Sequence, residues 1–171
     1  MFLQIGIDSL FFGSCLHLYA LFDLLGKSFD GDKPKFVRRH QVLLDLADEL
    51  KHAIKPVVFT VYFINSLILC IVGFQFLMID DLAVRFIALC MGCSYLIQTW
   101  IYSLGGQLVK DKSSSVAENF YQLDKDHVVI IARAQKPAVI KAWMYNAEVT
   151  TFCQVLNTTA SFMTVLKSLI K

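Results

Sequence analysis

Six polar side chains near the C-terminal end of the chain recur on one face of a predicted helix. The intervals between them are 4, 3, 4, 3 and 4 residues, and the residues are Thr150, Gln154, Asn157, Ser161, Thr164 and Ser168. The positions between them are mostly apolar, with Phe152, Val155 and Leu156 among them. A hydroxyl or amide without a partner is costly in hydrocarbon. This stripe must therefore meet other helices or water.

Two kinds of site account for the stripe. Ser, Thr, Asn and Gln form hydrogen bonds between helices inside compact membrane bundles. The same residues also line aqueous pores, but one stripe encloses nothing, so a pore needs the same helix from several subunits around an axis. We predict the pore. Glu148 at one end of the stripe favours cations, Lys167 near the other end does not, and Thr164 and Ser168 are candidates for a constriction.

The composition places the helix in a membrane. Of 171 residues, 56% are hydrophobic and 18% charged, whereas soluble domains have roughly 45–50% and 25%. The mean hydropathy is +0.56. These values argue against a soluble globular domain and against a disordered tail. The net charge of +2 gives no reason to expect a nucleic acid as a partner.

Long apolar stretches define the expected architecture. Each exceeds the roughly 20 residues that an α-helix needs to cross a bilayer, where only helices satisfy the backbone of such runs. We predict transmembrane helices at 1–25, 56–79, 84–109 and 137–170, and amphipathic helices within 26–55 and 110–136. The predicted fold class is therefore all-α, a polytopic membrane helical bundle with four transmembrane helices plus two cytoplasmic amphipathic helices.

Basic residues set the orientation. Of the 16 Lys and Arg residues, seven lie in 26–55 and six in 109–142. An excess of Lys and Arg marks cytoplasmic segments. These two segments are therefore expected inside the cell, and the C-terminus outside. The sequence therefore predicts a multi-pass membrane protein.

The two cytoplasmic segments each show an apolar face. In the first, one side of a helix carries Leu43, Leu46, Ala47, Leu50 and Ile54. In the second, Ser113–Ser115 followed by Glu118 predicts a helix start, and Pro137 begins the last helix. Such faces either lie on membrane lipid or pack together, or against copies, as an oligomerisation platform. The mixed charge favours protein partners.

Other reactive residues predict packing rather than chemistry. Cys90 and Cys93 have the spacing of a metal site, but no second Cys or His pair accompanies them. We therefore predict no metal, no cofactor and no enzymatic activity. Gly105 and Gly106 indicate a close helix approach or a bend, and Asp8 is a functional candidate because it lies in a predicted span.

Several motifs resemble the C-terminal region of insect odorant receptors. Near the N-terminus the resemblance is carried by Asp8-Ser-Leu-Phe-Phe12 and His40-Gln41-x-Leu-Leu44. Further along it is carried by Tyr102-x-x-Gly105-Gly106-x-Leu108, the serines at 113–115, Arg133-Ala-Gln-Lys-Pro137 and Ser161-Phe162 followed by Thr164-Val-Leu-Lys167. The resemblance covers essentially the whole chain.

The resemblance implies spans four to seven of a seven-span receptor, so the chain is expected to be the C-terminal part of a longer protein. It also implies a subunit of a ligand-gated cation channel, a hetero-tetramer with an odorant co-receptor subunit, in which the last helix lines the pore. Small volatile organic molecules would bind in the outer half, and the candidate contacts are Ile5, Ser9, Phe12, Met91, Ser94 and Tyr95. The alternative function is a four-span membrane scaffold or assembly protein without channel activity.

Overall fold

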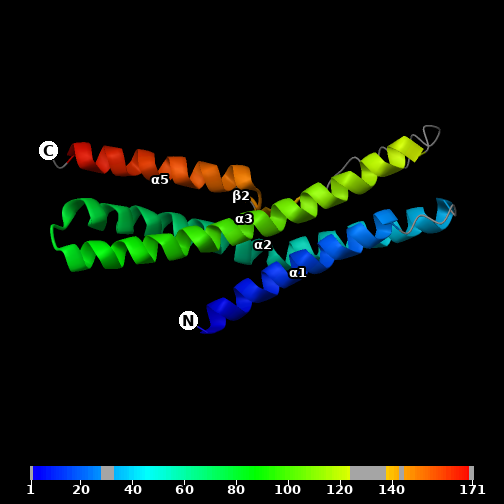
Figure 1. Ribbon diagram of the computed structural model, residues 1–171, viewed down its shortest axis with the longest axis horizontal. Coiled ribbons are helices and arrows are strands. Elements are labelled where there is room, and N and C mark those ends of the chain that lie inside the picture. Colours follow the sequence, from blue (N-terminus) through cyan, green and yellow to red (C-terminus); the bar gives the residue numbers. More distant parts are fainter. Residues whose placement is uncertain (1, 28–32, 124–137, 143–144, 170–171) are drawn as a thin grey trace.

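The computed structural model describes residues 2–27, 33–123, 138–142 and 145–169, which form four helices and one short hairpin (Figure 1). Apart from the hairpin the described chain is all-helical, as predicted. The helices are α1 (Phe2–Lys27), α2 (Lys33–Met78), α3 (Leu82–Leu123) and α5 (Val149–Leu169), and the antiparallel strands are β1 (Lys141–Ala142) and β2 (Tyr145–Asn146).

Three helices contain segments long and apolar enough to cross a membrane. These segments are Gln4–Lys27, Lys35–Met78 and Leu82–Val116. By the same criteria of length and composition, α5 does not qualify as a membrane span. The polar residues of α5 lower its mean hydropathy. The fourth predicted span therefore stays a prediction, whereas a multi-pass membrane protein is supported by the three segments.

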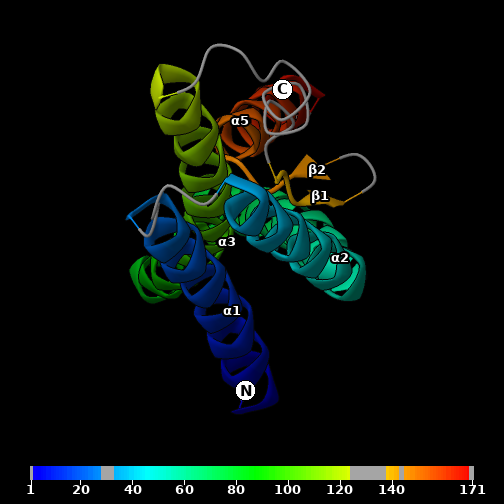
Figure 2. The same cartoon turned by 90° about the vertical axis from the view of Figure 1, so that its right-hand side faces the viewer.

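α3 extends from one end of the molecule to the other, and the other helices pack along it (Figure 1). α1 lies against one half of α3, and α5 lies along the half that leads to the α2–α3 turn. Figure 2 shows α1 and α5 on opposite sides of the α2–α3 pair. The C-terminal end of α5 lies at the same end as the α2–α3 turn, as the predicted topology requires.

α2 is one continuous helix where the sequence suggested two separate elements. It contains Pro56 in its interior, at the predicted border between the cytoplasmic helix and the span. Proline removes one backbone donor but does not always end a helix. No glycine or turn sequence accompanies Pro56, and the Thr60 hydroxyl donates to the Pro56 carbonyl at 2.8 Å. The cytoplasmic helix and the span are thus joined as one rod.

α3 also continues where we predicted a helix start. The hydroxyls of Ser113 and Ser115 donate at 2.9 Å to the carbonyls of Lys110 and Lys112. They therefore bond to the preceding turn of the same helix instead of capping a new one, and the expected capping box is wrong. The side chain of Glu118 and the predicted elements at 124–137 lie outside the described residues.

The last helix begins later than predicted. A hairpin precedes it, in which Lys141 pairs with Asn146 and the Ala147 amide donates to the Ile140 carbonyl at 2.9 Å. The ring of Tyr145 stacks on Tyr62 of α2 with centroids 5.5 Å apart. This aromatic contact and the hairpin bonds hold the segment extended. A helix running unbroken from Pro137 is therefore wrong, because α5 starts at Val149.

The apolar face of the first amphipathic segment is covered within the chain. Leu43, Ala47 and Ile54 are buried, whereas Leu46 is exposed. The ring of His40 on the same helix lies 6.4 Å from that of Phe22 in α1. Contacts with α1, which neither expected arrangement included, thus help to cover this face. The oligomerisation platform stays a prediction.

Candidate functional site

The polar stripe lies on a face of α5 that is exposed in the described chain, and Asn157 also borders a cavity that α5 forms with α2 and α3. All six of its residues are exposed: Thr150, Gln154, Asn157, Ser161, Thr164 and Ser168. The opposite face carries Thr151, Val155 and Thr159, which are buried against α2 and α3. The pattern of alternating faces follows directly from the 3.6-residue period. The stripe is therefore available to a neighbour or to water.

The members of the stripe differ in what they need from their surroundings. The Thr164 hydroxyl donates to the Ser161 carbonyl and the Ser168 hydroxyl to the Val165 carbonyl, both at 2.7 Å. These hydroxyls are satisfied by their own helix. Within the described chain the amides of Gln154 and Asn157 have no such partner. The side-chain amides of Gln154 and Asn157 therefore need water or another subunit as a hydrogen-bond partner.

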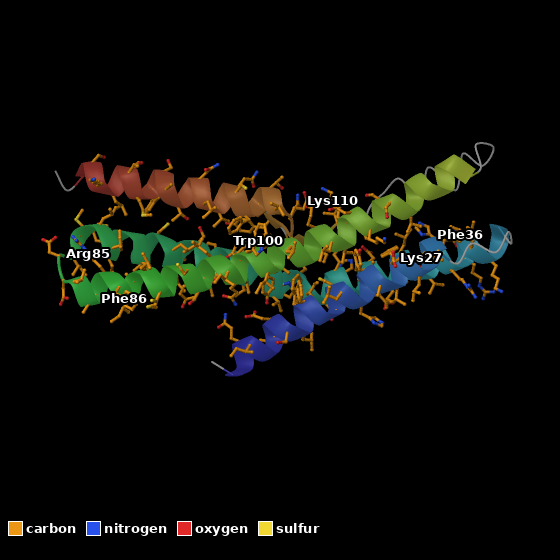
Figure 3. All side chains as sticks on the ribbon, viewed as in Figure 1. Lys27, Phe36, Arg85, Phe86, Trp100 and Lys110 are labelled. Atoms are coloured by element: carbon orange, nitrogen blue, oxygen red, sulfur yellow. The ribbon has the colours of Figure 1, made fainter. Side chains whose placement is uncertain are left out.

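Glu148 stands just before α5, and its carboxylate is bound by α3. Lys110 donates to Glu148 Oε2 at 2.9 Å, and the side chains are 31% and 12% exposed. Figure 3 shows Lys110 on the part of α3 near the start of α5. The sequence suggested that this carboxylate attracts cations to a pore. In this chain its charge is instead paired and mostly buried.

Two further contacts hold the same junction. A Cβ atom at Gly106 would overlap the Ala147 carbonyl oxygen, so only glycine allows the backbone before α5 to lie this close to α3. One turn further into α5, Phe152 meets Trp100 edge to face with ring centroids 5.3 Å apart. The predicted close approach at the glycine pair is confirmed.

A buried polar network joins α1, α2 and α3. Asp8 of α1 accepts hydrogen bonds from the Gln98 amide at 3.0 and 3.1 Å and from the Tyr102 hydroxyl at 2.8 Å. The Asn65 amide of α2 donates to Gln98 Oε1 at 3.2 Å and to the Thr99 hydroxyl at 3.1 Å. The Gln98 amide thus links Asn65 to the Asp8 carboxylate, whereas the Thr99 hydroxyl donates to the Tyr95 carbonyl. Sequence reasoning singled out Asp8 but missed its partners.

The predicted ligand contacts are not gathered in one place. Ile5, Ser9, Met91 and Ser94 are exposed in the described chain, and Tyr95 is half-buried. Phe12 lies beside Gly105, nearly three helical turns beyond Tyr95 along α3.

Two cavities lie elsewhere, and sequence reasoning missed both. One, of about 510 Å³, lies between α1 and α2 and is lined by Gln4, Ile7, Asp8, Pro56, Val57, Thr60, Val61, Ile64 and Asn65. The other, of about 650 Å³, lies between α2, α3 and α5, and its lining includes Gly73, Gly92, Asn157, Thr159 and Met163. Neither cavity is lined by any of the six predicted ligand contacts. The polar residues Asp8 and Asn65 within apolar runs were the signal for the first.

Cys90 and Cys93 are both exposed free thiols, so the interpretation of this pair as packing residues does not hold within the described chain. Among the residues that the structure describes, no group of three or more potential ligands could hold a metal ion.

The family model for 7tm Odorant receptor matches residues 1–160 of the chain. The chain belongs to the odorant receptor family. Odorant receptor 45a of Drosophila melanogaster is 30% identical over 185 residues, covering 97% of this chain and 49% of that protein. Odorant receptor 9a of the same fly is 30% identical over 140 residues, covering 75% of this chain and 35% of the relative.

A solved odorant receptor shares the fold. The olfactory receptor OR5 from Machilis hrabei, in complex with eugenol, superposes with a TM-score of 0.82 at 16% identity, covering 95% of this chain and 47% of that chain. The chain thus spans about half the length of Odorant receptor 45a and of the solved OR5 chain. The resemblance inferred from the sequence motifs is confirmed.

Proposed function

We propose that this chain is the pore-forming and ligand-binding part of an odorant-gated cation channel subunit. The subunit assembles with an odorant co-receptor subunit as a hetero-tetramer in the plasma membrane of olfactory neurons. It detects small volatile organic molecules. Its C-terminus and the α2–α3 turn lie outside the cell, and the opposite end of the molecule lies in the cytoplasm.

The observation that carries the pore is the exposure of the stripe on α5. All six residues are exposed, and Asn157 also borders the cavity between α2, α3 and α5. They are Thr150, Gln154, Asn157, Ser161, Thr164 and Ser168. In hydrocarbon an amide without a partner is strongly unfavourable. Copies of α5 around a symmetry axis would give the Gln154 and Asn157 amides water on the axis, with the apolar face turned to each subunit's own bundle.

The ligand-binding proposal rests on α1 and α3. Ile5, Ser9, Met91 and Ser94 are exposed, Phe12 and Tyr95 are half-buried, and in the proposed receptor further spans would enclose these predicted contacts. An apolar pocket with one or two hydroxyls suits a small volatile molecule. Gating follows if the ligand binds the open state more tightly than the closed state.

Thiol accessibility tests the pore directly. The full-length receptor is expressed with the co-receptor subunit, and odorant-evoked current is recorded before and after a water-soluble methanethiosulfonate reagent. The Cys153→Ser background removes the exposed native thiol of α5. In that background we expect Asn157→Cys to lose most of its current on modification. Val155→Cys, which is buried against the bundle, serves as the matched control and should keep its current.

Two results would contradict the proposal. Equal insensitivity of Asn157→Cys and Val155→Cys in a conducting receptor would show that the stripe does not line the pore. Absence of current across a broad panel of volatile molecules, with the receptor present at the cell surface, would favour the scaffold alternative.

A further inference from the structure

Within the described residues, the polar contacts between α5 and the other helices are concentrated at its first turn. Glu148 pairs with Lys110, and beside this pair Ala147 lies against Gly106 and Phe152 packs on Trp100. Further along, α5 contacts α2 through apolar groups, and Met163 lies close against Gly73. The ion pair is therefore the polar link between the start of α5 and α3.

The ion pair at this junction is placed to be strong. Glu148 lies at the N-terminal end of α5, where the helix dipole favours a negative charge. Its carboxylate also accepts from Lys110, and Thr150 Oγ1 lies 3.5 Å from it. Because the Glu148 side chain is only 12% exposed, salt and water screen the pair weakly. The pair ties the start of α5 to one point of α3.

The same stretch of α3 also holds α1. Tyr102 donates to Asp8, Gly106 lies one turn further, and Lys110 lies one turn beyond Gly106. A shift of α3 relative to α1 must therefore displace the Lys110 end of the pair. Because the pair is short and partly buried, the start of α5 has to follow.

We propose that Lys110 and Glu148 are positioning residues for gating, which make the first turn of α5 move with α3 when ligand binds. This inference rests on the proposed channel function and deepens it. Glu148 acts through Lys110 and not as a charge that permeating cations meet. Breaking the pair changes how readily the channel opens but leaves its preference among cations unchanged.

Exchanging the charges of Lys110 and Glu148 tests whether this ion pair acts in gating. Full-length receptors carrying Lys110→Glu, Glu148→Lys or both are expressed with the co-receptor subunit and activated by the strongest agonist of a panel of volatile alcohols, esters and ketones. We expect each single change to shift the half-maximal agonist concentration by about tenfold or more. The double swap should recover most of this shift, because it restores the opposite charges. The reversal potential in mixed cation solutions should stay constant.

Milder changes keep the test decisive if charge reversal prevents folding. Glu148→Gln and Lys110→Met preserve side-chain length, and surface biotinylation reports how much receptor reaches the membrane. Asp80→Asn is the matched control, since Asp80 pairs with Arg85 at the α2–α3 turn, far from this junction. The control should leave both the agonist concentration and the reversal potential unchanged.

Three results would overturn the inference. Glu148→Gln could change the reversal potential without moving the agonist concentration, which would assign the carboxylate to the pore. The double swap could behave no better than either single change, or Glu148→Gln and Lys110→Met could respond like the unmodified receptor. Absence of current from the unmodified receptor is a different result, because it overturns the channel function itself.

Discussion

The contact between α1 and α3 differs in kind from the contact between α3 and α5. Along α1 the two helices are held at several levels, by the Asp8 network, by Phe11 stacked on Tyr102 at 4.3 Å between ring centroids, and by Asp23 paired with Lys112. Along α5 the contacts other than apolar packing are concentrated at the first turn. Polar contacts thus hold α1 to α3 at several levels, whereas the described polar contacts between α3 and α5 lie at one end of α5.

This difference separates scaffold from moving part. A helix held by polar contacts at several levels can shift only if all of them rearrange together. A helix with polar contacts at one end can tilt about that end if its apolar contacts rearrange. Regions that move in function come from the less stabilised parts of a structure. In the proposed channel we therefore expect α5, which carries the exposed stripe, to move more than α1.

Among changes that test the difference between the α1–α3 and α3–α5 contacts, we expect the largest effect at Gly106. In Gly106→Ala the added methyl overlaps the Ala147 carbonyl, so the start of α5 must move. Overpacking of this kind costs about 1–3 kcal/mol. Agonist sensitivity falls by the part of that cost that differs between the closed and the open channel, up to about 150-fold. Recording agonist concentration–response curves checks this result.

Gly105→Ala is the matched control for that change. A Cβ there would lie 3.1 Å from the edge of the Phe11 ring, and a ring can shift where a backbone carbonyl cannot. We expect a smaller loss. Equal losses for the two variants would mean that the α5 junction is no tighter than the α1 contact.

A smaller effect, on thermal stability, is expected from a change at the contact between α1 and α3. Asp8→Leu leaves the donors of Gln98 and Tyr102 without their acceptor, which costs about 1–3 kcal/mol of folding free energy. Thermal unfolding of the purified receptor in detergent should show a lower melting temperature than the unmodified protein. Asp80→Leu, at an exposed carboxylate, should change it less. An unchanged melting temperature for Asp8→Leu would show that the Asp8 hydrogen bonds do not stabilise the contact between α1 and α3.

The smallest effect is expected at Thr164, on the free side of α5. The Thr164 hydroxyl already bonds to the Ser161 carbonyl, and Thr164→Val keeps the shape of the side chain. We expect thermal unfolding of the purified receptor to show a change in stability of less than about 0.5 kcal/mol. A larger loss of stability would show that a second group depends on this hydroxyl.

Much of the architecture could be predicted from local pattern. The apolar stretches predicted helices, the glycine pair predicted a close approach, and the motifs around Tyr102 and Gly105 predicted the family. These features depend on short-range periodicity or on residue types with few alternatives. The predicted ligand contacts depend on which residues of α1 and α3 face each other, and that register is set by the Asp8–Tyr102 contact, which no local pattern reveals.

The amino-acid sequence alone shows which residues of α5 share a face, because the helical period follows from backbone geometry. It also shows that α1, α2 and α3 are apolar enough to span a membrane. Three features become visible only in the folded chain: Glu148 pairs with Lys110, Pro56 lies inside a continuous helix, and a hairpin precedes α5. In each case the outcome depends on a partner far away in the chain or on the balance between a lost backbone bond and the packing that compensates for it.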